Sequence, residues 1–590
     1  MNKGRSFEGY EVTMNGVKMS IKMYLTIACS LALVGLAMIV YHNIRHFGEI
    51  WEQYPSILLM ALRTNNRESF IQALYLVPKI LLLSKQVVIA VGIGFIPAFM
   101  LSVHFFKSQA IKHRNSEYLR GAQIIPVSQI KRKMLFKKKN VPIGELRATF
   151  KDETAHFCII GKTRSGKSMA LKRAYHHLKK QGQRIVVYEN KGDYLPSYYD
   201  PQTDVIFCPV DKRSIQWSIW NDTKTVMDID QVICWSLIPK EQHENPFWGN
   251  AAREVLRAGL YYLFRKNQDM VTNAQIYKFF TSGPEHIATC ISNIPEGKAA
   301  YEMISDPQSK QTQGVISTLI NYITCLKYIK DQDGDFSVRD WIRKEGPGTL
   351  FIMNNAYTKD ILKPLLTLML DIISQEILSM TESLERRRYI ILDEFGTLHP
   401  MNSIIALLTR GGGMGASVWI GVQDIGQIDE IYGSNLRKAI INSCGTKILL
   451  CVDEVDTKEY ISSLIGDTEE SEVSDSDSMG LNSYRDGRSI SRSRKMKRLV
   501  MPSQLDSLPS LTGFCRLPAM PCTIIKIPIE HHPAKNPQIV MREEFFLHNI
   551  LKSRVPGRME SPDMHSDGDK GKGVRTNPAM NQAAHVIDID

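Results

Sequence analysis

Short runs of apolar residues recur along the chain from about residue 148, and stretches of helical character separate most of them. The runs span residues 157–160, 185–188, 205–207, 350–353, 389–392, 418–422 and 448–451. Runs of this length without polar interruption are typical of strands that are buried on both faces, as in a parallel sheet covered by helices. The pattern therefore predicts an α/β domain built from residues 144–220 and 332–530.

Residues 221–331 interrupt this alternation. They contain few strand signals and long helical ones, such as residues 251–264. Apolar positions at helical spacing, without strands between them, indicate a helical unit. We therefore expect an all-α domain that is inserted between two strands of the α/β domain.

Two longer apolar segments, residues 23–41 and 87–106, lie near the N-terminus. Each has about the length that a helix needs to cross the hydrocarbon core of a membrane, so we predict two transmembrane helices. Basic residues are denser in residues 1–22 and 107–143 than in the loop of residues 42–86. By the positive-inside tendency, both termini face the cytoplasm and the loop faces the periplasm.

Two alternatives exist for these apolar segments. A cleavable signal peptide is the alternative for the first segment, but the segment is longer than the apolar region of such a peptide and lacks a small-x-small cleavage site. Buried core helices are the alternative for both segments.

The composition shows an excess of basic over acidic residues and two stretches that are rich in polar residues. The chain has 590 residues and a formal net charge of +12 at pH 7, which suits a polyanionic partner or an anionic membrane face. Part of the excess positive charge lies in residues 107–143, which we predict to be a basic linker. This linker could contact anionic lipid or nucleic acid, or it could simply be solvated. Residues 467–498 are acidic first and basic later, which makes them a candidate mobile loop, although we favour simple solvated disorder. We also predict a flexible C-terminal tail at residues 531–590.

The chemistry of the chain is concentrated in residues 156–170, which read HFCIIGKTRSGKSMA. An apolar strand, a glycine-containing loop and a helix-favouring segment follow one another, with the spacing G-x-x-x-x-G-K-[ST] of a phosphate-binding loop. Glycines let the backbone turn so that successive N–H groups point at a phosphate, and the helix N-terminus adds positive charge. We expect Lys167 to reach the terminal phosphates and the Ser168 hydroxyl to hold Mg²⁺. The candidate nucleotide-binding residues are Gly161, Lys162, Thr163, Arg164, Ser165, Gly166, Lys167 and Ser168.

Two carboxylates, Asp393 and Glu394, end the fifth apolar run. In a Walker B arrangement Asp393 holds Mg²⁺ and Glu394 polarises the attacking water, whereas the alternative is a strand that ends in solvent with incidental charges. The next strand ends at Gln423, whose amide can sense the γ-phosphate or orient water, and the alternative is a plain strand-end residue. Arg410 precedes three glycines. It is a candidate arginine finger for the site of an adjacent subunit, and the alternative is an ordinary surface arginine. The sequence thus predicts an ATP and Mg²⁺ site with Lys167, Glu394, Gln423 and Arg410 as catalytic residues.

Seven stretches together resemble the TraD/TraG family of type IV coupling proteins, the inner-membrane ATPases of bacterial conjugation, and the F-type TraD branch most of all. They are GKTRSGKS (161–168), YENKGDY (188–194), SYYDPQTDVIFCPVDKR (197–213), NPFWGNAAREVL (245–256), FSVRDWI (336–342), ILDEFGTL (391–398) and GVQDIGQIDEIYG (421–433). Two N-terminal spans, a RecA-like domain and an inserted all-α domain also match the layout of that family.

The resemblance implies a homohexamer around a central channel, attached to the components of a type IV secretion channel. Such an assembly engages a single DNA strand bound by a relaxase and its relaxosome proteins, and it drives DNA transfer with ATP. One departure concerns the finger arginine, which the family places about two positions after Arg410, where this chain has Gly412.

The expected function is therefore ATP-driven DNA translocation at the bacterial inner membrane. The first alternative is a coupling ATPase that recruits protein effectors without handling DNA, and DNA-stimulated ATPase activity with steep salt dependence separates the two. A chromosome-partition pump of the FtsK kind usually has more spans and a C-terminal winged-helix reader, and the sequence indicates neither. A non-catalytic scaffold with a relic phosphate loop is disfavoured by the intact pair Asp393 and Glu394.

Overall fold

The computed structural model of the chain describes residues 117–240, 246–267, 271–478 and 487–546, together with scattered positions between residues 27 and 71. The predicted membrane segments lie outside these residues, apart from three positions of the first, and so does the tail beyond residue 546. Within the described part of the chain, no helix combines the length and the apolar character needed to cross a membrane.

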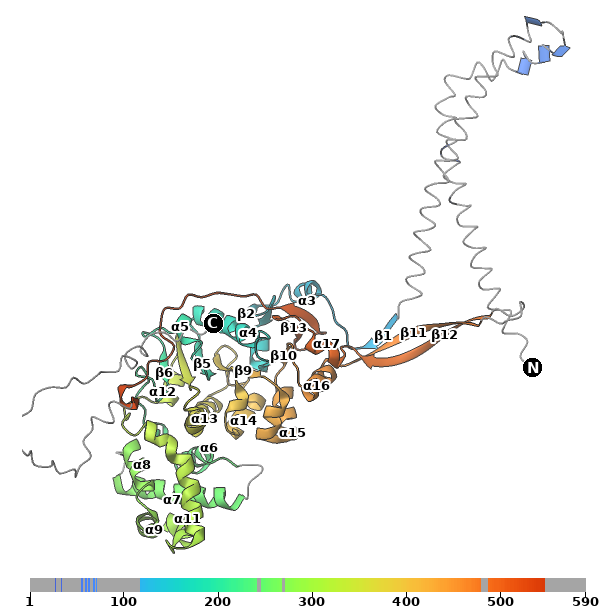
Figure 1. Cartoon of the computed structure of the whole chain (residues 1–590). Coiled ribbons are helices and arrows are strands. Elements are labelled where there is room, and N and C mark those ends of the chain that lie inside the picture. Colours follow the sequence, from blue (N-terminus) through green and yellow to red (C-terminus); the bar gives the residue numbers. More distant parts are fainter. Residues whose placement is uncertain are drawn as a thin grey trace, which may run out of the picture.

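A nine-stranded sheet forms the centre of the body, in the order β14-β13-β10-β4-β9-β8-β5-β7-β6 (Figure 1). The seven strands from β10 to β6 run parallel to one another, whereas β13 pairs with β10 in antiparallel fashion and β14 pairs with β13 in antiparallel fashion. The strands are β4 (Phe157–Ile160), β5 (Arg184–Glu189), β6 (Val205–Phe207), β7 (Gly348–Met353), β8 (Arg388–Leu392), β9 (Ala416–Val422), β10 (Thr446–Leu449), β13 (Thr512–Arg516) and β14 (Thr523–Lys526).

All seven apolar runs of the sequence form the parallel strands of this sheet, so the predicted α/β class is confirmed. Every residue of β4, β5, β7, β8 and β9 is buried, as expected for strands that are covered on both faces. Across the central pair, the rings of Phe157 and Trp419 stack with centroids 3.6 Å apart. The two antiparallel strands were not predicted, because β14 alternates buried and exposed residues over only four positions.

Helices cover the sheet according to the direction in which the chain crosses it. The connection from β4 to β5 moves toward β6, whereas the connections from β7 to β8, β8 to β9 and β9 to β10 move the opposite way. Since such crossovers are right-handed, α4 lies on one face and α13, α14 and α15 on the other (Figure 1). The helices of this part are α4 (Lys167–Lys180), α5 (Leu195–Tyr198), α12 (Val338–Arg343), α13 (Lys359–Leu378), α14 (Asn402–Arg410), α15 (Ile425–Ser443), α16 (Val455–Ile465) and α17 (Pro502–Asp506).

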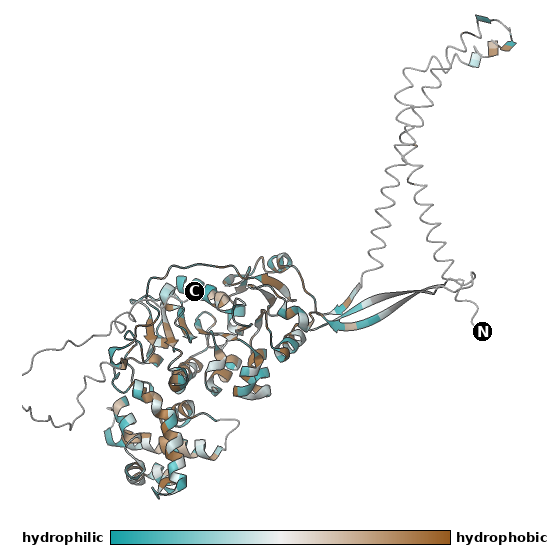
Figure 2. Cartoon of the chain, in the orientation of Figure 1, coloured by the Kyte–Doolittle hydropathy of each residue, from teal (hydrophilic) through white to brown (hydrophobic). Residues whose placement is uncertain are grey.

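A separate helical unit occupies the insertion between β6 and β7 (Figure 1). Its long helix α7 contains the predicted helical segment 251–264 and packs against α8 to α11. Apolar residues gather inside the unit and polar residues outside (Figure 2). Gly259 of α7 allows a close approach, since a Cβ at this position would overlap the Phe280 ring. The helices are α6 (Cys234–Leu237), α7 (Pro246–Asn267), α8 (Asn273–Phe280), α9 (Pro284–Ser292), α10 (Lys298–Ile304) and α11 (Lys310–Ile323).

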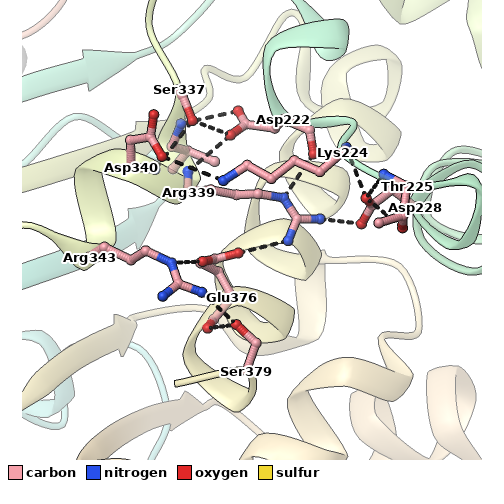
Figure 3. A network of polar contacts seen from close by, with 11 residues as sticks. Asp222, Lys224, Thr225, Asp228, Ser337, Arg339, Asp340, Arg343, Glu376 and Ser379 are labelled. Carbon is pink, nitrogen blue, oxygen red and sulfur yellow. Dashed lines mark hydrogen bonds and ion pairs between the residues drawn. The ribbon is translucent and has the colours of Figure 1, made fainter. Parts of the chain in front are cut away.

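A buried polar network ties the entry and exit of the insertion to helix α13 (Figure 3). The Arg339 guanidinium donates to the Asp222 carbonyl at 2.8 Å, to a Glu376 carboxylate oxygen at 2.8 Å and to Asp228. The Asp222 carboxylate accepts the backbone N–H groups of Val338 and Arg339 at the start of α12, at 3.1 and 3.0 Å. Asp222 precedes the helical unit, Asp228 begins the π-helix (Asp228–Ile233) that runs into α6, Arg339 follows the unit, and Glu376 belongs to α13. The network therefore fixes both connections to the α/β body.

A three-stranded arm projects from the body (Figure 1). Strands β11 (Asp467–Ser478) and β12 (Gly487–Arg498) form an antiparallel hairpin, and β1 (Glu117–Gly121) pairs with β11. The predicted disorder of residues 467–498 is therefore wrong for the described residues. Cross-strand ion pairs explain the result: the acidic half of the stretch faces the basic half, as in Lys497–Glu470 at 2.7 Å.

The predicted basic linker also contains regular structure from residue 117 onward. Helix α3 (Val127–Lys133) lies near β14, and β2 (Lys139–Ile143) pairs with β3 (Leu146–Thr149). Buried Ile130 and Met134 anchor the segment, although basic side chains surround them in the sequence.

Residues 529–546, which we call the strap, cross the body after β14 instead of leaving it. The prediction of a flexible tail from residue 531 is wrong for the described part of the strap. Backbone hydrogen bonds hold it: the Lys535 N–H donates to the Pro196 carbonyl, Lys212 N–H donates to the Val540 carbonyl at 2.7 Å, and Arg542 N–H donates to the Val210 carbonyl at 3.0 Å. Main-chain pairing of this kind needs few apolar side chains, which is why composition predicted disorder.

Candidate nucleotide-binding site

The predicted phosphate loop forms the connection between β4 and α4 at the carboxyl edge of the sheet. Its backbone is held from both neighbouring strands, because Gly161 N–H donates to the Val422 carbonyl at 3.0 Å and Lys162 N–H donates to the Cys451 carbonyl at 2.9 Å. Arg164 and Gly166 have positive φ values of 64° and 113°. These two residues turn the chain so that N–H groups gather on one side of the loop before α4 begins.

The first residues of α4 face the end of β8, which lies two strands away. The Ser168 hydroxyl donates to an Asp393 carboxylate oxygen at 3.0 Å. Burial raises the pKa of Asp393, and the Lys167 ammonium and the Ser168 hydroxyl oppose that rise. The structure therefore brings together Lys167, Ser168 and Asp393, which the sequence assigned to phosphate and Mg²⁺.

Glu394 follows Asp393 and lies beside a polar cluster at the end of β5. The Asn190 side-chain amide donates to a Glu394 carboxylate oxygen at 3.5 Å and to the Thr397 hydroxyl at 2.9 Å. The Tyr188 hydroxyl donates to the Asn190 amide oxygen at 3.0 Å. Sequence reasoning missed Asn190 as a site residue, although it lies within the stretch YENKGDY that resembles the coupling-protein family.

Glu189 is a second carboxyl group that was not predicted. It is 2% exposed, and burial raises its pKa to about 8, against the backbone N–H groups of Tyr194 and Asp193, which donate to it. The two donors lie 3.2 and 2.8 Å from its carboxylate oxygens. Glu189 thus shapes the turn after β5 beside the Asp393 carboxylate.

Other predicted residues of the loop lie at its rim. Thr163 and Arg164 are exposed, and the Lys162 ammonium pairs with Asp453 at 2.7 Å. Gln423 is half-buried directly after β9, the strand that lies between β4 and β8. It therefore borders the space between the phosphate loop and the two carboxylates.

Arg410 lies elsewhere. It is exposed at the end of α14. The turn that follows it contacts the segment before β4, because a Cβ on Gly412 would lie 2.7 Å from the Thr154 carbonyl oxygen. The same turn contacts the segment before β8, because a Cβ on Gly415 would overlap the Arg386 carbonyl oxygen. These segments mark the amino edge of the parallel sheet, opposite the phosphate loop. Arg410 therefore does not reach the phosphate loop of its own chain.

The residues at the loop fit a nucleotide with Mg²⁺. The Ser165 hydroxyl is buried inside the turn and has no hydrogen-bond partner among the described residues. Ser168 and Asp393 supply the hard oxygen ligands that Mg²⁺ prefers, and Lys167 supplies a cation for the phosphates. The loop thus offers a cation for the phosphates, and oxygen ligands for Mg²⁺ beside it.

Comparison with known proteins extends this result beyond the site. Coupling protein TraD of Escherichia coli (strain K12) is 28% identical over 415 residues, which are 69% of this chain and 57% of TraD. The chain thus spans little more than half of the length of that relative. The unbound structure of the conjugative coupling protein TrwB, in a truncated form, matches with a TM-score of 0.63 and 25% identity over 72% of this chain and 96% of TrwB.

A TrwB structure in complex with ADP and Mg²⁺ matches equally well, with a TM-score of 0.63 and 24% identity over 72% of this chain and 97% of that one. The resemblance that the sequence motifs predicted is confirmed at the family level. The family described as type IV secretion-system coupling protein DNA-binding domain matches residues 140–528, the part that contains the sheet, the helical insertion and the phosphate loop. The chain belongs to this family of type IV secretion-system coupling proteins.

Proposed function

We propose that the chain is an ATP-hydrolysing coupling protein that moves single-stranded DNA toward a type IV secretion channel during bacterial conjugation. One observation carries the enzymatic part of the proposal. Lys167, Ser168, Asp393 and Glu394 converge at one edge of the sheet, with Ser168 and Asp393 in direct hydrogen-bond contact at 3.0 Å. This set supplies a phosphate-binding cation, Mg²⁺ ligands and a carboxylate for the attacking water.

Each of these residues has a defined role in the proposal. Bound Mg²⁺ supplies charge neutralisation for the phosphates. Lys167 orients and neutralises the terminal phosphates, while Ser168 and Asp393 hold the cation. Glu394 accepts a proton from the attacking water, and Asn190 keeps its carboxylate in place through their 3.5 Å contact. Gln423 responds to the γ-phosphate, and Arg410 serves a neighbouring subunit.

The remaining parts of the proposal concern the assembly. Residues 23–41 and 87–106 anchor the chain in the bacterial inner membrane, with both termini in the cytoplasm. Six copies form a ring around the DNA, and Arg410, exposed at the amino edge of the sheet, completes the site of the next subunit. Relaxosome proteins deliver the strand, and components of the secretion channel receive it. Membership of the coupling-protein family supports these assignments.

ATP hydrolysis by the full-length chain in detergent, with and without single-stranded DNA and over a range of protein concentrations, tests the proposal. We expect DNA to stimulate hydrolysis, salt to reduce the stimulation steeply, and the rate per chain to rise with concentration. Glu394→Gln binds ATP but does not hydrolyse it, whereas the matched variant Glu430→Gln, at an exposed glutamate of α15, keeps the wild-type rate.

Two outcomes contradict the proposal. Wild-type turnover in Glu394→Gln removes the catalytic assignment. Hydrolysis that DNA never stimulates, at any salt concentration, favours the alternative in which the chain recruits protein effectors without handling DNA.

A further inference from the structure

Helix α3 and the turn after it place a basic surface on the body, close to the root of the arm (Figure 1). This part of the chain has no acidic residue between Glu117 and Glu145. Its exposed basic side chains are Lys131, Arg132, Lys133, Lys137 and Lys138. We call these residues, together with Leu135 and Phe136, the α3 patch.

The α3 patch belongs to the folded body. Ile130 and Met134 are 0% and 1% exposed, so they hold one side of the segment against the core. The chain before the helix is joined to the start of β14, because the Ile125 N–H donates to the Cys522 carbonyl at 2.9 Å and the Thr523 hydroxyl donates to the Ile125 carbonyl at 2.7 Å. This anchoring argues against the interpretation of the segment as a plain solvated linker.

Two large apolar side chains lie at the centre of the α3 patch. Leu135 is 62% exposed and Phe136 is 97% exposed. Backbone hydrogen bonds hold the turn that carries them: the Leu135 N–H donates to the Arg132 carbonyl and the Lys137 N–H donates to the Met134 carbonyl, each at 3.2 Å. A leucine and a phenylalanine in water, with basic residues on both sides, form the combination that is typical of segments that bind a membrane surface.

An anionic bilayer surface matches each group of the α3 patch. Its headgroups attract the lysine and arginine side chains, and its acyl boundary accepts the leucine and phenylalanine side chains. The order along the chain agrees, because the second predicted span ends about 20 residues before α3, a length of chain that reaches at most about 70 Å.

Single-stranded DNA matches the α3 patch less well. Proteins that bind it without sequence preference combine a basic groove with aromatic rings on which successive bases stack. The α3 patch is instead a turn that offers one aromatic ring, Phe136, beside an aliphatic side chain, Leu135. The aliphatic side chain has no stacking role, whereas it adds apolar area to a membrane contact.

We propose that the α3 patch docks the ATP-binding body on the anionic surface of the membrane, with the Leu135 and Phe136 side chains at the acyl boundary. The inference rests on the proposed function, because it takes the chain to be anchored in the bacterial inner membrane. It goes further in giving the folded body a lipid contact of its own, in addition to the two predicted spans. This contact sets which side of the body faces the bilayer.

Photo-crosslinking from residue 136 tests the proposal. The photoreactive amino acid p-benzoylphenylalanine replaces Phe136 in the full-length chain, which is reconstituted in vesicles with single-stranded DNA present. The vesicles contain phosphatidylcholine alone or equal parts of phosphatidylcholine and phosphatidylglycerol. We expect mass spectrometry to detect a lipid adduct with a yield at least about fivefold higher in the anionic vesicles, the gain that one basic side chain near such a surface provides.

A charge variant and a matched control sharpen the comparison. The combined substitutions Lys131→Gln, Arg132→Gln and Lys133→Gln, made with the photoreactive residue still at position 136, remove exposed charges and leave the apolar pair. We expect them to abolish the gain in anionic vesicles. The control places p-benzoylphenylalanine at Leu384, which is 89% exposed and precedes Glu385, and we expect no lipid adduct from it in either kind of vesicle.

Three results overturn the proposal: no lipid adduct from residue 136, an adduct of equal yield in the two kinds of vesicle, or an adduct to DNA or to a second copy of the chain in place of lipid. Carbonate extraction of the same vesicles tests the membrane anchor separately. A chain that carbonate releases overturns the membrane part of the proposed function, whereas a retained chain without a lipid adduct at residue 136 overturns the docking of the α3 patch alone.

Discussion

The buried network around Glu376 allows a comparison of two arginines that pair with the same carboxylate (Figure 3). Arg339 and Arg343 both donate to Glu376, which is 3% exposed at its side chain. The Arg339 side chain is 8% exposed and the Arg343 side chain is 50% exposed. The difference in exposure predicts a large difference in the contribution of each arginine to stability.

Replacement by methionine keeps most of the aliphatic stem and removes the charge in either case. Arg339→Met leaves Glu376 without its buried partner and removes the donors to Asp228 and to the Asp222 carbonyl. Breaking a buried pair from one side costs about 3–5 kcal/mol of unfolding free energy. Arg343→Met removes a pair that is open to water and costs about 1 kcal/mol or less.

Thermal unfolding of the full-length variants measures the difference. In a body larger than about 250 residues each kcal/mol shifts the midpoint by roughly 1–2 °C, so Arg339→Met lowers the midpoint by at least about 3 °C and Arg343→Met by less than about 2 °C. Hydrogen exchange gives a local readout, because the amides of Val338 and Arg339 donate to Asp222 and lose protection in the Arg339 variant only. Equal losses of stability in the two variants refute the argument from burial.

Three further predictions concern the site and the core. Arg410→Ala keeps ATP affinity but hydrolyses about 10³-fold more slowly, and mixing it with Glu394→Gln restores part of the rate if the arginine acts between subunits. Asn190→Asp places a second carboxylate beside Glu394, 3.5 Å from the present amide, so the acidic limb of the pH–rate profile moves up by about one pH unit. Burial lowers the pKa of His156 to about 4 while its ring accepts the Val418 N–H at 3.1 Å, so only the unfolded chain binds the proton between pH 6.5 and about 4. Stability therefore falls by roughly 3 kcal/mol as the pH falls through this window, and His156→Asn, measured by thermal unfolding against pH, removes that dependence.

Local patterns predicted the parts of the fold that local physics determines. Each parallel strand is a continuous apolar run because both of its faces are buried, and the phosphate loop is one continuous motif. Lys167, Ser168 and Asp393 were recognisable for the same reason. The motifs assigned Ser168 and Asp393 to the same Mg²⁺, and the two residues meet because parallel strands present their carboxyl ends at one edge of the sheet.

The unpredicted parts depend on partners that are distant in the sequence. Asn190 reaches Glu394 only because β5 lies beside β8. Glu189 and Asn190 belong to the stretch YENKGDY, but nothing within that stretch indicates which of its side chains reach the site. The strap is ordered by hydrogen bonds to backbone groups more than 300 residues earlier, such as the pair of Lys535 and Pro196. The arm is ordered by acidic and basic side chains that face each other across its strands. Composition does not show which residues face each other, so it did not predict the arm.

The pairing of β1 with β11 has a mechanical consequence. Glu117 lies opposite Ser471 and Gly121 lies opposite Thr468, so β1 runs back along the arm toward the body. A pull on residue 117 directed outward along the arm loads the cross-strand hydrogen bonds in shear, and several bonds must break together before β1 slides. A pulling force between residue 117 and the ATP-binding body is therefore carried by the paired strands of the arm, and not by β1 alone.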